Sequence, residues 1–144
     1  MNKGFTIIEV LLSVSILAFL SIGSITVFQS FQRTNDLNVT INLLSHTLRR
    51  AQGLAQASDG DSTWGVALQT QTITLFKGGS YATRDSNFDE LLDVAAGITM
   101  SGLSEVVFSK VSGDPQATGT TTLQIAELNE TRAVNINAKG MVSF

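Results

Sequence analysis

The chain has 144 residues, of which 43% are hydrophobic and only 15% are charged, whereas a soluble domain usually has about 25% charged residues. This length suits one domain. Nine basic and twelve acidic residues give a net charge of −3, which argues against a general nucleic-acid-binding surface. The sequence contains no cysteine, so disulfides, a thiolate nucleophile and a cysteine-based zinc site are excluded.

The N-terminal segment is the most hydrophobic part of the chain. No charged residue lies between Glu9 and Arg33. As a helix, this window of about 23 residues would be about 34 Å long, whereas the hydrocarbon core of a bilayer is about 30 Å thick. The segment therefore argues against a purely soluble monomer and predicts a helix that crosses a membrane.

Three ordinary interpretations explain only part of this segment. A secretory signal beginning at Lys3 and cleaved before Ser24 would leave unexplained the carboxylate of Glu9 and the apolar residues beyond the cleavage site. A plain membrane anchor also leaves Glu9 unexplained, because a charge at mid-membrane costs about 2.5–3.5 kcal/mol on insertion scales. A buried core helix of this length exceeds what a small domain can surround.

A motif at the N-terminus accounts for all of these residues. Residues 3–12 read Lys3-Gly4-Phe5-Thr6-Ile7-Ile8-Glu9-Val10-Leu11-Leu12. They resemble the class III signal of type IV pilins and type II secretion pseudopilins, in which a basic leader and a glycine precede a phenylalanine, with a glutamate four residues later. The resemblance implies that the prepilin peptidase, a membrane aspartyl protease, cuts between Gly4 and Phe5. It also implies that Phe5 is N-methylated and that the apolar helix is retained.

Elementary chemistry is consistent with these roles. Gly4 has no Cβ, so a protease can approach the backbone closely, and Lys3 favours the cytoplasmic side of the membrane. The new amine on Phe5 and the carboxylate of Glu9 are each costly in apolar surroundings. We therefore expect Glu9 of one subunit to accept the Phe5 amine of a neighbour in a filament. The alternative is a carboxylate at position 9 that is favoured only by the helix dipole.

Beyond the apolar segment, hydrophobic residues recur at steps of four and three. These residues are Leu37, Ile41, Leu44, Leu48, Ala51 and Ala55. The spacing places them on one face of a helix that packs on another element. We expect the helix to stop at Ser58-Asp59-Gly60-Asp61, with Gly60 as a left-handed cap. A single helix over residues 5–57 would be about 80 Å long, so half of it would project from a head of this size.

The remaining residues indicate strands separated by turns. Strands are expected at residues 64–68, 72–76, 98–100, 105–111, 120–128, 133–137 and 141–144. A short helix is expected to begin at Ser86, with Asp89 completing its cap. The predicted fold is α+β and type IV pilin-like. It has a leader (1–4), a transmembrane or filament-core half-helix (5–32), an amphipathic half-helix (33–57) and an antiparallel β-sheet head (58–144).

A narrower resemblance extends over the rest of the chain. It rests on residues 48–55, on Trp64-Gly65-Val66, on Val107-Phe108 and on residues 132–142. These segments are similar to H-type pseudopilins and to the FimT group of minor pilins, which implies a low-copy subunit near a filament tip. Some FimT-like proteins bind DNA through basic residues near the C-terminus. This chain has only Lys139 beside Gly140, followed by four uncharged residues, so nucleic acid is not an expected partner.

Enzymatic and metal-binding patterns are weak. His46, the sole histidine, has no acid or nucleophile spaced to assist it. The run from Asp85 to Asp89 begins like a calcium loop, but Glu90 replaces the required glycine. Asp59 and Asp61 fit a turn better than a cation site. We therefore predict no catalytic residue, no metal and no cofactor.

Two classes of function remain. The first is a structural filament subunit, anchored in the cytoplasmic membrane with its head outside and later part of a pilus or pseudopilus. Its partners would be the prepilin peptidase and other pilin or pseudopilin subunits. The second is a secreted or membrane-anchored binding module, an adhesin, whose N-terminus serves only for export. The N-terminal residue of the mature protein distinguishes the two classes.

Overall fold

The computed structural model describes residues 4–144, with the side chains of residues 22–26 left out of the description. The chain divides into two compact units, one ending at Thr34 and one comprising Asn35–Phe144. A long helix, α1 (Ile7–Gln56), is followed by eight strands. The strands are β1 (Trp64–Gln69), β2 (Thr72–Lys77), β3 (Asp85–Asp93), β4 (Ile98–Ser101), β5 (Glu105–Phe108), β6 (Gly119–Ile125), β7 (Glu130–Ile136) and β8 (Val142–Ser143). Two single-turn 3₁₀ helices, η1 (Asp59–Asp61) and η2 (Tyr81–Thr83), lie in the loops.

The C-terminal part of α1 packs through the face that its sequence predicts. The six apolar residues spaced by four and three are all buried, and they belong to one hydrophobic core with residues of the strands. The helix ends at Gln56, before the predicted glycine cap. Ser58 already adopts the left-handed conformation (φ 54°), whereas Gly60 (φ 59°) lies inside η1. The predicted cap is therefore two residues too late.

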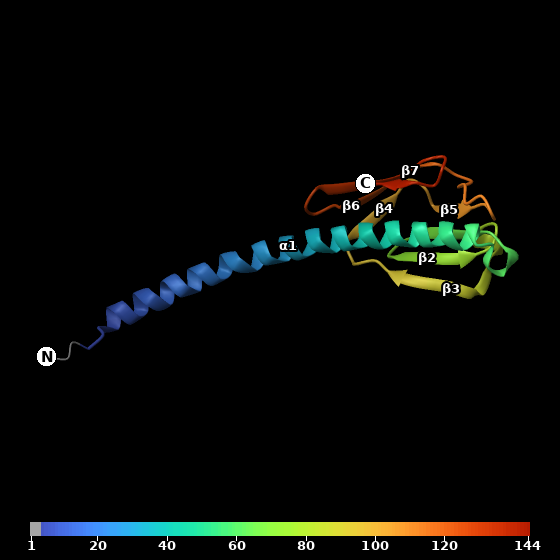
Figure 1. Ribbon diagram of the computed structural model, residues 1–144. Coiled ribbons are helices and arrows are strands. Elements are labelled where there is room, and N and C mark those ends of the chain that lie inside the picture. The colour runs from blue at the N-terminus through green and yellow to red at the C-terminus, as the bar shows by residue number, and fades with distance from the viewer. Residues whose placement is uncertain (1–3) are drawn as a thin grey trace. The chain divides into compact units, whose positions relative to one another are not determined.

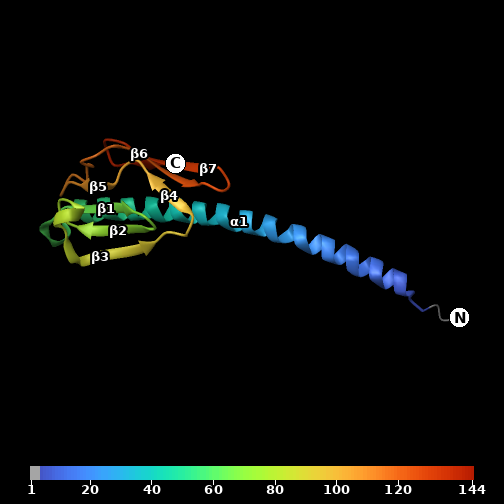
Figure 2. The same ribbon diagram turned by 180° about the vertical axis from the view of Figure 1, so that it is seen from behind.

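The strands form two antiparallel sheets. The first has the order β3-β2-β1-β5, and the second has the order β4-β6-β7-β8. In the second unit, β2 and β3 lie on one side of α1 in both views and β6 and β7 on the other, while β1 overlaps the helix (Figures 1 and 2). The core fills the space where the helix and the inner faces of both sheets meet. The predicted α+β fold, a long helix packed on an antiparallel head, is thus confirmed, with the head divided into two sheets.

The helix predicted at Ser86 is wrong. Residues of this segment form β3, which pairs with β2 over the register Thr72↔Asp93 to Lys77↔Asp85. The side chain that was expected to complete the cap, Asp89, instead binds Arg84, with 2.7 Å between Oδ2 and Nε. The backbone pairing with β2 therefore outweighs the local capping pattern.

Turns shorten two of the predicted strands. β5 ends at Phe108 because the next residues form a turn in which Gly113 N donates to Ser109 O (2.9 Å). β6 ends at Ile125, and the following turn places Asn129 in the left-handed region (φ 52°). β7 in turn begins at Glu130, three residues before the predicted start.

Gly102, which follows β4, lies close to the backbone of β6 at Thr120. A Cβ at this position would lie 2.2 Å from the carbonyl oxygen of Thr120, and φ is +107°. Gly102→Ala is therefore expected to lower the free energy of unfolding by about 2 kcal/mol or more. Gly97→Ala should lower the free energy of unfolding by a smaller amount. Its φ of +89° is also strained for alanine, but the added Cβ meets no atom within 4 Å. Thermal unfolding of the full-length variants checks this order, and equal losses would contradict it.

Candidate processing and assembly site

The predicted cleavage site lies just outside the helix. Residues 4–6 have no regular secondary structure, and α1 begins at Ile7. Thr6 caps the helix, because its Oγ1 and its carbonyl oxygen both accept from Glu9 N, at 3.3 and 3.1 Å. Threonine is a favoured N-cap, and a glutamate three residues later is the spacing of a capping box. The Gly4–Phe5 bond therefore lies in non-helical backbone that a protease can bind in an extended form.

The structure itself does not require glycine at position 4. A Cβ built on Gly4 meets no atom within 4 Å. The next side chain, Phe5, is 84% exposed. A requirement for glycine here would therefore come from an enzyme that binds the segment and not from packing within the chain. Lys3, the predicted basic residue of the leader, lies outside the described residues.

Glu9 lies exposed in the first turn of α1. Among the described side chains, those of residues 4–21 and 27–144, none forms a hydrogen bond or an ion pair with its carboxylate. Its position favours a negative charge, since the N-terminus of a helix carries a partial positive charge. An exposed carboxylate at this position can be reached by a partner outside this chain.

Apolar side chains are exposed around the whole first part of α1. Those more than half exposed are Phe5, Ile7, Ile8, Val10, Leu11, Leu12, Val14, Ile16, Leu17, Phe19 and Leu20. The hydroxyls among them are satisfied within the helix: Ser13, Ser15 and Ser21 each donate to the carbonyl four residues earlier, at 2.7 Å. An exposed apolar surface of this extent indicates a contact with something outside the chain.

Among the described side chains, those of residues 4–21 and 27–144, no helix is both long and apolar enough to span a membrane. The transmembrane segment predicted for residues 5–32 therefore stays a prediction.

Residues of the other predicted patterns have ordinary structural surroundings. His46 is exposed on α1. Lys110 binds Asp61, and this hydrogen bond, together with the lysine's charge, lowers the pKa of the Asp61 carboxyl. Any stability from this exposed pair is present at neutral pH and is lost as the pH falls through that lowered pKa. In the part of the chain that the structure describes, no cluster of three or more histidine, aspartate or glutamate side chains could hold a metal.

Comparison with known families gives a match at the N-terminus. Residues 1–25 match the model of the prokaryotic N-terminal methylation motif. With the fold, this match supports the type IV pilin and pseudopilin superfamily and indicates a structural protein that is exported. A motif of this class implies processing by the prepilin peptidase and assembly with other pilins. The chain matches no curated protein and no solved structure.

Proposed function

We propose that the protein is a structural subunit, a minor pilin or pseudopilin, of a type IV pilus or a type II secretion pseudopilus. The observation that carries this proposal is the sequence of features at the N-terminus. A non-helical Gly4–Phe5 bond precedes a capped helix, and the first part of that helix exposes apolar side chains on all sides. A filament subunit requires a cleavable leader followed by a helix whose apolar side chains are buried by lipid or by neighbouring subunits.

In this proposal the first part of α1 has two successive surroundings. Before assembly it lies in the cytoplasmic membrane, with Lys3 on the cytoplasmic side and the head outside. After assembly it packs against the same segment of neighbouring subunits in the filament core. The serine hydroxyls suit both surroundings, because each is already bonded to a carbonyl of its own helix and leaves no unsatisfied donor in an apolar medium.

Glu9 and Phe5 supply the polar contact of the assembly. Cleavage after Gly4 leaves a positive amine on Phe5, and N-methylation keeps that charge. No described side chain of the same subunit forms an ion pair with the Glu9 carboxylate, so this carboxylate can accept the amine of an adjacent subunit. Each charge then offsets the cost of burying the other.

Within the superfamily we assign the chain to the H-type pseudopilin and FimT group. The segments that resemble this group form the end of α1, β1, β5 and the β7–β8 hairpin of the head. This assignment implies a low-copy position near the tip of the filament.

Mass spectrometry of the mature N-terminus tests the proposal. The protein expressed with a prepilin peptidase should begin with N-methylated Phe5. Cells lacking the peptidase should yield the chain with Met1–Gly4 still attached. A mature chain beginning near Ser24 would instead show an ordinary secretory signal, and would favour an exported binding module such as an adhesin.

A further inference from the structure

Three of the four outer edges of the two sheets are protected against pairing with another strand. β3 carries four carboxylates and a bulge opposite Leu75 and Lys77. β5 is covered by the segment at Pro115, which forms a bridge with Phe108. β8 has only two residues. Charges, bulges, proline and short length are the usual means by which proteins keep edge strands unpaired.

The fourth edge, that of β4, has none of these chemical protections. β4 pairs with β6 on one side only, and its sequence, Ile98-Thr99-Met100-Ser101, contains no charge and no proline. Its residue types favour a strand. Its other side pairs with no strand, and Ile98 N donates to Ala95 O in the preceding turn, at 3.3 Å. The remaining backbone groups on that side are a template for a further strand.

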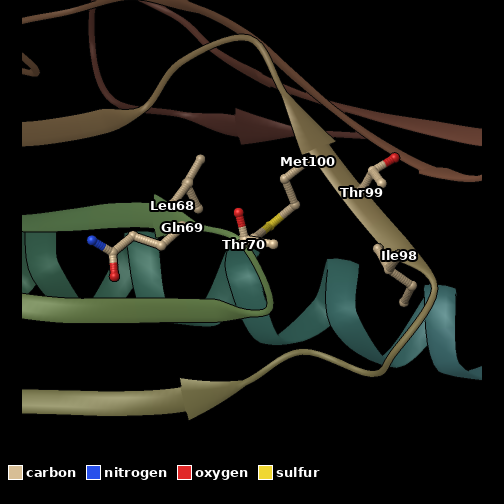
Figure 3. Close-up of a pocket in the computed structure, with 6 residues that line it drawn as sticks. All are labelled: Leu68, Gln69, Thr70, Ile98, Thr99 and Met100. Atoms are coloured by element: carbon tan, nitrogen blue, oxygen red, sulfur yellow. The ribbon is translucent and has the colours of Figure 1, made fainter.

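This open edge borders a groove of about 670 Å³. The opposite wall is the end of β1 and the turn of the β1–β2 hairpin. The lining residues are Leu68, Gln69, Thr70, Ile98, Thr99 and Met100. Met100 points from β4 toward Thr70 in the hairpin turn, as Figure 3 shows.

The composition of the groove restricts what it can hold. No lining residue is charged, so a charged ligand would lose its hydration without gaining an ion pair. Leu68, Ile98 and Met100 offer apolar contacts, and Gln69, Thr70 and Thr99 offer neutral hydrogen-bonding groups. Apolar and neutral polar contacts beside an unpaired strand edge suit a polypeptide with alternating apolar and hydroxyl side chains.

We propose that this groove binds an extended, uncharged segment of another protein, which adds as a strand to the free edge of β4. A single strand is favoured over a second folded copy of this chain because the β1–β2 turn stands across the groove from β4 (Figure 3). A whole sheet edge approaching β4 would meet this turn, whereas one extended segment lies between the two walls. The proposal does not depend on processing at Gly4 or on filament assembly.

Hydrogen exchange of the full-length protein in detergent tests strand addition. The probe is a neutral peptide of six residues that alternates serine and valine, acetylated and amidated at its ends. Such a generic peptide suffices, because main-chain hydrogen bonds supply the affinity in strand addition. At a peptide concentration ten times the Kd, exchange of the outward amides of residues 98–101 should slow about tenfold. The fully N-methylated peptide, which has no amide donors, should give no slowing.

A pair of variants locates the binding. Thr70 is exposed in the hairpin turn, so Thr70→Trp should fill the groove without disturbing the core. This variant should abolish the slowing. The matched control is Thr131→Trp, which makes the same change at an exposed position of β7, in the sheet that contains β4 but away from the groove. The control should bind like the original protein, and circular dichroism should show that both variants remain folded.

Three results would overturn the proposal. The first is no slowing at residues 98–101 with millimolar peptide. The second is slowing that persists with the N-methylated peptide or in Thr70→Trp, since binding would then not use the strand edge in this groove. The third is a dimer of the peptide-free protein that Thr70→Trp dissociates, because the occupant would then be a second copy.

Discussion

Replacing Gly4 with valine is expected to leave residues 1–4 attached to essentially all of the protein. The structure offers open space for a side chain at this position, since an added Cβ meets no atom within 4 Å. The fold should therefore be unchanged. The loss of cleavage would arise in the complex with the peptidase, because a branched Cβ would keep the scissile backbone away from the catalytic aspartates. Intact-mass measurement of protein from cells that contain the peptidase checks this expectation.

The matched control for this variant is Gly79→Val. Gly79 is also exposed, and a Cβ at this position also meets no atom within 4 Å. The control should be cleaved and methylated like the original protein, which separates the local effect at Gly4 from a general effect of valine. Normal cleavage of Gly4→Val would contradict the assigned site.

The regular parts of the fold could be predicted because each is encoded by a local pattern. The buried face of α1 follows from apolar steps of four and three, and Leu44, near its middle, has no exposed surface. β1 and β2 follow from two alternating runs joined by a short polar turn, and they pair as the sequence suggests, from Trp64↔Lys77 to Gln69↔Thr72.

β3 could not be predicted in the same way. Its sequence has four acidic residues and a capping pattern at Ser86, both of which favour a helix start. The strand forms because β2 presents an unpaired edge, and because Leu92 lies opposite Ile73 and packs against the core. This contact joins residues about 20 positions apart, so no local window of the sequence contains it.

The two candidate sites also differ in whether a local window of the sequence reveals them. The N-terminal site is a contiguous motif in which Gly4, Phe5 and Glu9 lie within six residues. A short window of the sequence is therefore enough to predict it. The groove beside β4 joins the β1–β2 turn to a strand about 30 residues later. The only signal in the sequence is the uncharged run Ile98-Thr99-Met100-Ser101, and it becomes informative only when the structure shows that β4 is an edge strand.

In the proposed filament subunit, the N-terminal site and the groove would contribute differently to assembly. Exposed apolar side chains on the first part of α1 can be covered by any similar helix, so packing there selects its partners weakly. Strand addition in the groove would depend on backbone geometry and on the absence of charge, and would therefore favour extended, uncharged segments over charged ones. The first part of α1 would then drive assembly, and the groove beside β4 would select the partner.

Glu9→Gln is expected to reduce incorporation into filaments about a hundredfold or more, with cleavage after Gly4 unaffected. The substitution preserves the size of the side chain and removes the charge. Breaking one half of a buried ion pair costs about 3–5 kcal/mol, because the amine on Phe5 of the neighbouring subunit would be buried without a counter-charge. The amount of the protein in sheared filaments, relative to the membrane fraction, measures this loss.

Two further variants separate the ion pair from a simple effect of charge. Asp93→Asn removes a carboxylate at the exposed end of β3 and should incorporate normally. The double variant Gly4→Val with Glu9→Gln should assemble no worse than Gly4→Val alone, because the uncleaved chain has no Phe5 amine for Glu9 to accept. Normal incorporation of Glu9→Gln would refute the pairing. The helix dipole would then be the sufficient reason for a carboxylate at position 9, since that interaction contributes only about 0.3–1 kcal/mol.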